Sequence, residues 1–173
     1  MIQMNNIIIQ LIGIVAYIFL IISYQRKNKK EILLFHIIAA IFFAIHFYLL
    51  NGITGSICNI IGAFMMLIIY FFEKKNYKNK SILFLILIPV LVLITVLTYD
   101  NIYSILPIIA SLIVLIGFLL KDENKIRLIG MISDISWLIY GIIYLSYPAI
   151  VFETITIISI IIAIINNKKK VIK

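Results

Sequence analysis

The chain has 173 residues, of which 64% are hydrophobic and only 13% are charged. Soluble domains average nearer half apolar and a quarter charged, so the composition excludes that class and predicts an integral membrane protein. A net charge of +8 would suggest nucleic-acid binding in a soluble protein, but here the cations fall in short loops and a tail, as membrane topology requires.

Seven apolar stretches follow one another along the chain. A helix of about 20 residues is roughly 30 Å long, which matches the hydrocarbon thickness of a bilayer. The expected spans are residues 6–24, 32–50, 55–72, 81–98, 102–120, 127–146 and 148–166.

The positions of the Lys and Arg residues support this count, because all 15 fall in alternate connections or in the tail. They are Arg26, Lys27, Lys29, Lys30, Lys74, Lys75, Lys78, Lys80, Lys121, Lys125, Arg127, Lys168, Lys169, Lys170 and Lys173. The connections "NGITG", "YDN" and "LSYP" carry none. By the positive-inside rule, we expect the N-terminus outside the cell and the C-terminus in the cytoplasm.

The first three spans match the last three at a fixed offset of 94 residues, without a gap from Leu11 to Lys75. Basic loop falls on basic loop, and several polar, aromatic or helix-perturbing residues coincide. These pairs are Gly13 with Pro107, Phe43 with Trp137, His46 with Tyr140, and Asn59 with Glu153. Two three-span repeats share one orientation only if another span reverses the chain, a role that residues 81–98 fit.

The predicted fold is an all-α integral membrane protein with seven transmembrane helices in a 3 + 1 + 3 plan. The first three-helix repeat is residues 1–75, and residues 76–101 form a linker loop and an inversion-linker helix. Residues 102–173 form the second repeat, which ends in a basic cytoplasmic tail. Parallel repeats about an axis along the membrane normal are a known transporter plan.

A polar and aromatic stripe marks one face of several predicted helices. On the sixth span, Gly130, Ser133, Asp134, Trp137 and Tyr140 fall within about 120° of arc at 100° per residue. Ionisable residues in spans normally face a bundle interior or a water-filled cavity. We therefore expect these stripes to surround one shared cavity.

The predicted solute site consists of Trp137, Phe43, Asn59, Glu153, His46 and Tyr140. Trp137 and Phe43 would stack on the solute, whereas Asn59, His46 and Glu153 would hydrogen-bond to it. A carboxyl group in such a cavity can exchange a proton, so Glu153 and Asp134 are the candidate proton sites. Helix packing stays open as an alternative for the two histidines and Asn59, and Asp134 could instead pair with Arg127 or a neighbouring Lys.

Two residues are candidate hinges. Pro107 lacks a backbone donor and would kink the fifth span, and Gly13 is its flexible counterpart in the first.

No enzyme motif is found. The sequence has no HExxH pair, no Ser/Lys dyad within spans and no aspartate pair placed for intramembrane proteolysis. Two His and one Cys make a poor ligand set for a metal. We expect no catalysis, no cofactor and no metal; the expected partners are the lipid bilayer and an unidentified small polar solute, and a homo-oligomer is left open.

The plan and the paired pocket positions resemble the SWEET, semiSWEET and PQ-loop transporter superfamily. That resemblance implies a pocket lined by a tryptophan pair and an asparagine pair. Trp137 and Asn59 keep one member of each pair, while Phe43 and Glu153 stand at the others. Only Pro107 fits the proline pattern of those transporters, and no PQ dipeptide is present.

A closer resemblance is to the bacterial YgjV-like inner-membrane family. "AIHFYLLNGITG", "CNIIG" and "SWLIYG…FE" are similar to its motifs, although the arginine that often follows its asparagine is missing from the third span. The leading hypothesis is a carrier of a small polar solute that works by alternating access, with proton coupling as an option. The alternative is a receptor or scaffold of the same fold that transports nothing.

Overall fold

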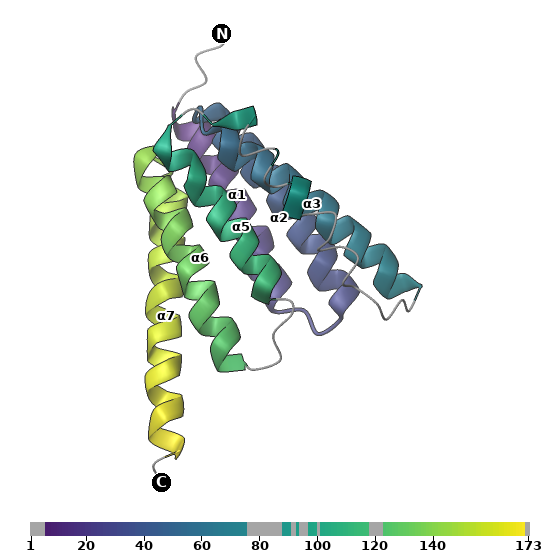
Figure 1. The fold of residues 1–173 in the computed structure, drawn as a ribbon, viewed down its shortest axis with the longest axis vertical. Coiled ribbons are helices and arrows are strands. Elements are labelled where there is room, and N and C mark those ends of the chain that lie inside the picture. Colours follow the sequence, from purple (N-terminus) through teal and green to yellow (C-terminus); the bar gives the residue numbers. More distant parts are fainter. Residues whose placement is uncertain are drawn as a thin grey trace.

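The computed structural model describes residues 6–75, 88–90, 93, 97–99, 101–117 and 123–171, and every regular element within these residues is helical. Figure 1 shows a helical bundle with the N-terminus at its upper end and the C-terminus at its lower end. We use "upper end" for the side with the α2–α3 and α6–α7 turns, and "lower end" for the side with the α1–α2 turn.

The first three helices run down, up and down through the bundle (Figure 1). They are α1 (Asn6–Tyr24), α2 (Lys29–Leu49) and α3 (Ile53–Lys74). α2 begins where the side chain of Asn28 accepts a hydrogen bond from Lys30 N at 3.0 Å, the interaction typical of a helix N-cap. α2 packs against both α1 and α3. The first three expected spans are therefore confirmed as helices.

The last helices run in the same order of directions. They are the 3₁₀ turn η1 (Ile102–Ser104), α5 (Ile105–Gly117), α6 (Glu123–Ile143) and α7 (Tyr147–Val171). α6 packs against both α5 and α7, and the two sets meet where α3 contacts α5 and α1 contacts α7. α7 continues as a helix five residues past the expected end at residue 166.

The expected fourth span, residues 81–98, lies largely outside the described residues. Short helical pieces at 88–90, 93 and 97–98 are the described part of it. The linker loop that begins at residue 76 is also outside the described part, up to residue 87.

The two upper-end turns have the same backbone geometry. Asn51 and Leu145 are the non-glycine residues of the described chain with positive φ, at 63° and 53°. Four backbone hydrogen bonds of the α2–α3 turn recur in the α6–α7 turn at the 94-residue offset. In the α2–α3 turn they are Leu50 N–His46 O (3.1 Å), Asn51 N–Tyr48 O (3.0 Å), Gly52 N–Phe47 O (2.8 Å) and Ser56 N–Gly52 O (3.0 Å). Their counterparts, in the same order, are Tyr144 N–Tyr140 O (3.1 Å), Leu145 N–Ile142 O (3.3 Å), Ser146 N–Gly141 O (2.8 Å) and Ile150 N–Ser146 O (3.1 Å).

Apolar side chains cover the outside of the bundle, while several polar ones are buried inside it. Val151, Ile155, Ile158 and Ile162 are exposed at helical spacing along α7, and His46 and Ser146 are fully buried. Within the described residues, four helical segments are long and apolar enough to cross a membrane: residues 6–23, 30–49, 53–72 and 147–165, with shorter apolar helices at 102–114 and 128–143. Large exposed apolar surface of this kind suits lipid rather than water.

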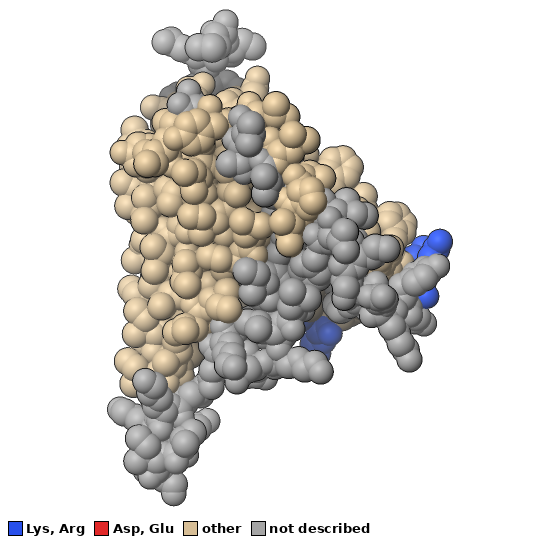
Figure 2. Space-filling model, viewed as in Figure 1, with Lys and Arg blue, Asp and Glu red and all other residues tan. Residues whose placement is uncertain are grey.

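The described Lys and Arg residues lie at the lower end. They occur in the α1–α2 turn and the start of α2, at the end of α3, at the start of α6 and at the end of α7. In Figure 2 the blue cationic atoms lie at the right-hand edge and at the lower margin of the central part, while tan surface covers the upper and left-hand parts of the view.

Candidate functional site

A hydrogen bond between the first and last helices anchors the site. The Tyr17 hydroxyl on α1 donates to Glu153 Oε1 on α7 across 2.7 Å. The Tyr17 ring also stacks on Phe152 with centroids 4.4 Å apart, and it meets the edge of Phe43 on α2 at 4.7 Å. Ring packing of this kind fixes the orientation of the hydroxyl, so the Glu153 carboxyl is held at a defined place.

A further aromatic contact joins α6 to α2. Trp137 on α6 stacks on Phe47 of α2, with ring centroids 5.4 Å apart. Asn59 on α3 donates from its side-chain amide to Gly55 O, one turn earlier, at 2.9 Å. That bond fixes the amide plane of Asn59.

These side chains line one central cavity of about 310 Å³. All six described α-helices contribute to its wall, α5 through Val114. The wall includes four of the six residues predicted for the solute site, together with the predicted proton-site residue Asp134: Trp137, Phe43, Asn59, Glu153 and Asp134. The structure thus brings these five residues together, whereas their roles stay predictions.

Asp134 and His36 lie on the same wall. His36 Nδ1 contacts Ser23 Oγ and, at 3.2 Å, Ile32 O, so this imidazole is engaged by α1 and by its own helix. Asp134 acts electrostatically on Glu153 and has no hydrogen-bond partner in the described part of the chain. The side chain of Arg127, the alternative partner of Asp134, lies outside what the structure describes.

His46 does not line the cavity. Its ring is buried near the upper end, where Nδ1 contacts Ile9 O at 2.8 Å and Nε2 contacts Ser146 Oγ at 2.7 Å. Since a carbonyl only accepts, Nδ1 carries the proton there, and Nε2 accepts from Ser146 when the ring is neutral. The expectation that His46 faces the solute cavity is corrected, because its two ring nitrogens are used to join α1, α2 and the α6–α7 turn.

Tyr140 is also away from the cavity wall. Its ring is fully buried, and its hydroxyl accepts a hydrogen bond from Gly55 N on α3 at 3.0 Å. A Cβ at Gly55 would lie 2.5 Å from Tyr140 Cε1, so the glycine is what admits the ring. Tyr140 therefore ties α6 to α3, and the expectation that it lines the cavity is corrected as well.

The upper end of the bundle is held by further bonds between elements. Gln10 on α1 donates from Nε2 to Leu145 O at 2.9 Å and accepts from Tyr147 N at 3.1 Å. Thr54 Oγ1 donates to Thr98 O at 2.9 Å. Together with the contacts of the buried His46 and Tyr140, these bonds join the elements at the upper end of the bundle. Toward the lower end the helices spread apart, as Figure 1 shows for α3 and α7.

The two candidate hinge residues lie in different surroundings from those expected. Pro107 is the third residue of α5, directly after η1, and it is buried. A proline in the first turn of an α-helix removes no hydrogen bond that the helix needs. We expected Pro107 to kink the middle of the span; instead it lies at the start of α5. At Gly13 a Cβ would lie 2.8 Å from His46 Cε1, so this glycine makes room for the imidazole.

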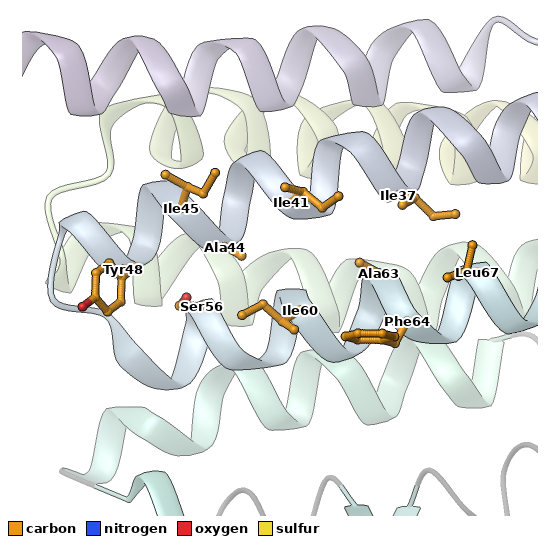
Figure 3. Close-up of a pocket in the computed structure, with 10 residues that line it drawn as sticks. All are labelled: Ile37, Ile41, Ala44, Ile45, Tyr48, Ser56, Ile60, Ala63, Phe64 and Leu67. Carbon is orange, nitrogen blue, oxygen red and sulfur yellow. The ribbon is translucent and has the colours of Figure 1, made fainter.

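A second, larger groove of about 580 Å³ lies between α2 and α3, away from the carboxyl groups. Figure 3 shows its lining side chains along the two helices. They are aliphatic or aromatic, apart from the hydroxyls of Ser56 and Tyr48. This apolar lining offers no set of polar groups that could hold a polar solute, so the central cavity is the better candidate site.

Sequence reasoning missed several wall residues, above all Tyr17, Phe47 and Phe152. Tyr17 follows Gly13 by four positions, so both share one face of α1, and this spacing could have marked it. Phe152 precedes Glu153 and carries no pattern that separates it from other apolar residues of α7. Among the described residues, no group of three His, Cys, Asp or Glu is placed to hold a metal ion.

Comparison with known proteins identifies a family. The model of the family Imp-YgjV, described as bacterial inner membrane protein, matches residues 7–170. No curated protein and no solved structure matches the chain. The resemblance to the YgjV-like family is thereby confirmed over nearly the whole length.

Proposed function

Because the chain belongs to the Imp-YgjV family of bacterial inner membrane proteins, we propose that it carries a small polar solute across that membrane by alternating access. One observation supports this most directly: a cavity of about 310 Å³, with contributions from all six described α-helices, contains two carboxyl groups. Ionisable groups inside a membrane are costly and mark solute or proton pathways.

The proposal includes the 3 + 1 + 3 plan and a relationship to the SWEET and PQ-loop carriers. The matched turns around Asn51 and Leu145 support it, since positive φ and four hydrogen bonds recur at the repeat offset. The described cations at the lower end support a cytoplasmic lower end, with the N-terminus outside. In this orientation the bonds that join the helices at the upper end would lie on the outer side of the membrane.

Transport would require the upper end to open while the lower end closes. The contacts to be broken are those of His46 with Ser146 and of Tyr140 with Gly55.

Proton coupling would be carried by Glu153. The titratable side chains that share its wall are Asp134 on α6, His36 on α2 and Tyr17 on α1, while α3 and α5 contribute the uncharged Asn59 and Val114. A carboxyl that exchanges a proton during the cycle makes flux depend on pH. Glu153→Gln keeps the shape of the side chain and removes the titration.

The test is uptake into proteoliposomes by the purified protein. Sugars, amino acids and amines are first screened for thermal stabilisation of the detergent-solubilised protein, and those that stabilise it are used radiolabelled. We expect saturable uptake, with a pH dependence that is lost in Glu153→Gln and kept in Glu31→Gln, an exposed carboxylate at the start of α2. Equal pH profiles in wild type and Glu153→Gln would contradict the proton role.

A receptor or scaffold that transports nothing is the second candidate. Several hydrogen bonds between elements at the upper end favour this second candidate. A carrier would have to break them in every transport cycle, whereas a protein that does not transport can keep them. Saturable binding without flux for every stabilising solute would support this candidate and reject the carrier. Both candidates are non-enzymatic.

A further inference from the structure

The central cavity offers its contents more acceptors than donors. Most hydroxyl and amide donors on its wall are directed at other protein atoms: Tyr17 Oη to Glu153 Oε1 (2.7 Å), Asn59 Nδ2 to Gly55 O (2.9 Å), Thr156 Oγ1 to Phe152 O (2.9 Å) and Ser133 Oγ to Ala110 O (3.4 Å). Apart from the His36 ring, which contacts Ser23 and Ile32, the side-chain donors that remain on the described wall are the Trp137 indole N–H and the second amide hydrogen of Asn59.

The acceptors, by contrast, are largely unused. Neither carboxyl oxygen of Asp134 has a hydrogen-bond partner in the described part of the chain, and Glu153 receives one bond, at Oε1. Asn59 Oδ1 is also an acceptor on this wall. A solute that fills the space therefore needs to donate hydrogen bonds rather than accept them.

The charged residues of the wall also favour a solute that donates hydrogen bonds. No Lys or Arg is among the described residues that line the cavity, whereas two carboxyl groups are. An anionic solute would meet two carboxyl groups and no described cation in a medium of low dielectric constant. A cationic solute, in contrast, can be balanced by the charge of one carboxyl group that has released its proton.

The aromatic rings of the wall add a second attraction for a cation. Tyr17 contacts Phe43 and Phe152, and Trp137 stacks on Phe47, all within one aromatic and apolar cluster. Ring faces attract cationic groups electrostatically, and the effect is strongest for tryptophan and for desolvated sites. A cavity lined by two carboxyl groups and several aromatic rings combines both features.

We propose that the solute of this cavity is a small organic cation of the ammonium class, held between the carboxyl groups of Asp134 and Glu153 and the rings of Trp137 and Tyr17. This inference rests on the proposed function, since it assigns the solute of the same site. When the cation enters, a carboxylic acid on the wall gives up its proton to water, and when the cation leaves, the proton returns. Charge in the cavity is thereby balanced in both states.

The experiment measures binding to the full-length protein in detergent, independently of flux. The probes are choline, its uncharged isostere 3,3-dimethylbutan-1-ol and the anion 3,3-dimethylbutanoate, with butylammonium as a cation that also donates N–H bonds. We expect the two cations to bind at least about tenfold more tightly than the neutral and anionic probes, because a charge-assisted contact contributes roughly that factor.

Asp134→Asn is the main variant because it keeps shape and removes charge, and Glu31→Gln is its control at an exposed site. Cation affinity should fall about tenfold or more in Asp134→Asn, while affinity for the neutral isostere and the melting temperature stay within error. Glu31→Gln should bind all probes as wild type does.

Three results would overturn the inference: no binding of either cation, equal affinity for choline and its neutral isostere, or unchanged cation affinity in Asp134→Asn. A failure of the cation-site inference can be distinguished from a failure of the proposed carrier function. Cation binding without flux in proteoliposomes rejects the carrier and keeps the cation site, whereas flux of an uncharged solute without cation binding rejects the cation site and keeps the carrier.

Discussion

Asn51 and Leu145, 94 positions apart, hold the same left-handed backbone conformation at the tips of two equivalent turns. Asparagine tolerates this conformation because its short polar side chain can bond locally, whereas leucine does not. The turn bonds are nevertheless the same in both places. The α6–α7 turn therefore retains a strained residue where the α2–α3 turn has a suitable one.

Leu145→Asn is expected to stabilise the protein by about 1 kcal/mol, since a left-handed conformation costs a non-glycine residue roughly that much. Leu145 is 60% exposed, so little packing is lost. The free energy of unfolding, or the melting temperature in detergent, measures the change. Asn51→Leu is the matched reverse substitution and should destabilise by a similar amount; a stabilising Asn51→Leu would contradict this account of the turns.

Gly13→Ala should lower the free energy of unfolding by about 1–3 kcal/mol, as overpacking of a filled site does. The new Cβ would lie 2.8 Å from His46 Cε1, and the two contacts of the imidazole prevent the ring from moving away. Gly62→Ala is the control, because no described atom lies within 4 Å of its Cβ position. There the better helix propensity of alanine should raise stability by up to about 1 kcal/mol. Equal effects of both substitutions would show that the contact with His46 does not matter.

Tyr17→Phe should keep the ring stacking on Phe152 and lose the bond to Glu153. We expect a loss of about 1–3 kcal/mol, the usual cost of removing a hydrogen bond to a carboxyl group in a desolvated place. Thermal unfolding measures it. Tyr147→Phe serves for comparison, since that side chain is exposed at the upper end, and it should change the melting temperature by no more than the error of the measurement.

Ser146→Ala should loosen the upper end, because it removes the hydroxyl that His46 Nε2 contacts at 2.7 Å and that accepts from Ala149 N at 3.4 Å. A double-mutant cycle with His46→Phe should give a coupling energy of about 1 kcal/mol. A cysteine at Thr156, on the cavity wall, should then react faster with a reagent added from outside the cell. Unchanged labelling would mean that this contact does not control access.

Topology can be checked with single cysteines on a Cys58→Ala background, Cys58 being 3% exposed. Tyr147→Cys at the upper end should react with a membrane-impermeant maleimide in intact cells, because the positive-inside rule puts that end outside. Lys75→Cys, exposed at the lower end, should react only after the cells are opened. The opposite pattern would invert the orientation.

Much of this molecule follows from its sequence. Long apolar stretches have few alternatives to spanning helices, because only hydrogen-bonded backbone is tolerated in lipid, and the alternating cations indicate which connections share a side. The expected first three spans and the last three correspond to described helices, and periodicity on α6 correctly placed Asp134 and Trp137 on the cavity wall.

What the tertiary structure decided is which polar side chains face the cavity and which hold the helices together. His46 and Tyr140 share a helix face with Phe43 and Trp137, yet they are fully buried in contacts with Ser146 and Gly55. Helical spacing fixes the direction of a side chain about its own axis but not the distance to the next helix, which depends on where that helix carries a glycine. The Tyr17–Glu153 hydrogen bond could not be predicted from the sequence either. Its two residues are 136 positions apart and meet only because α1 packs against α7.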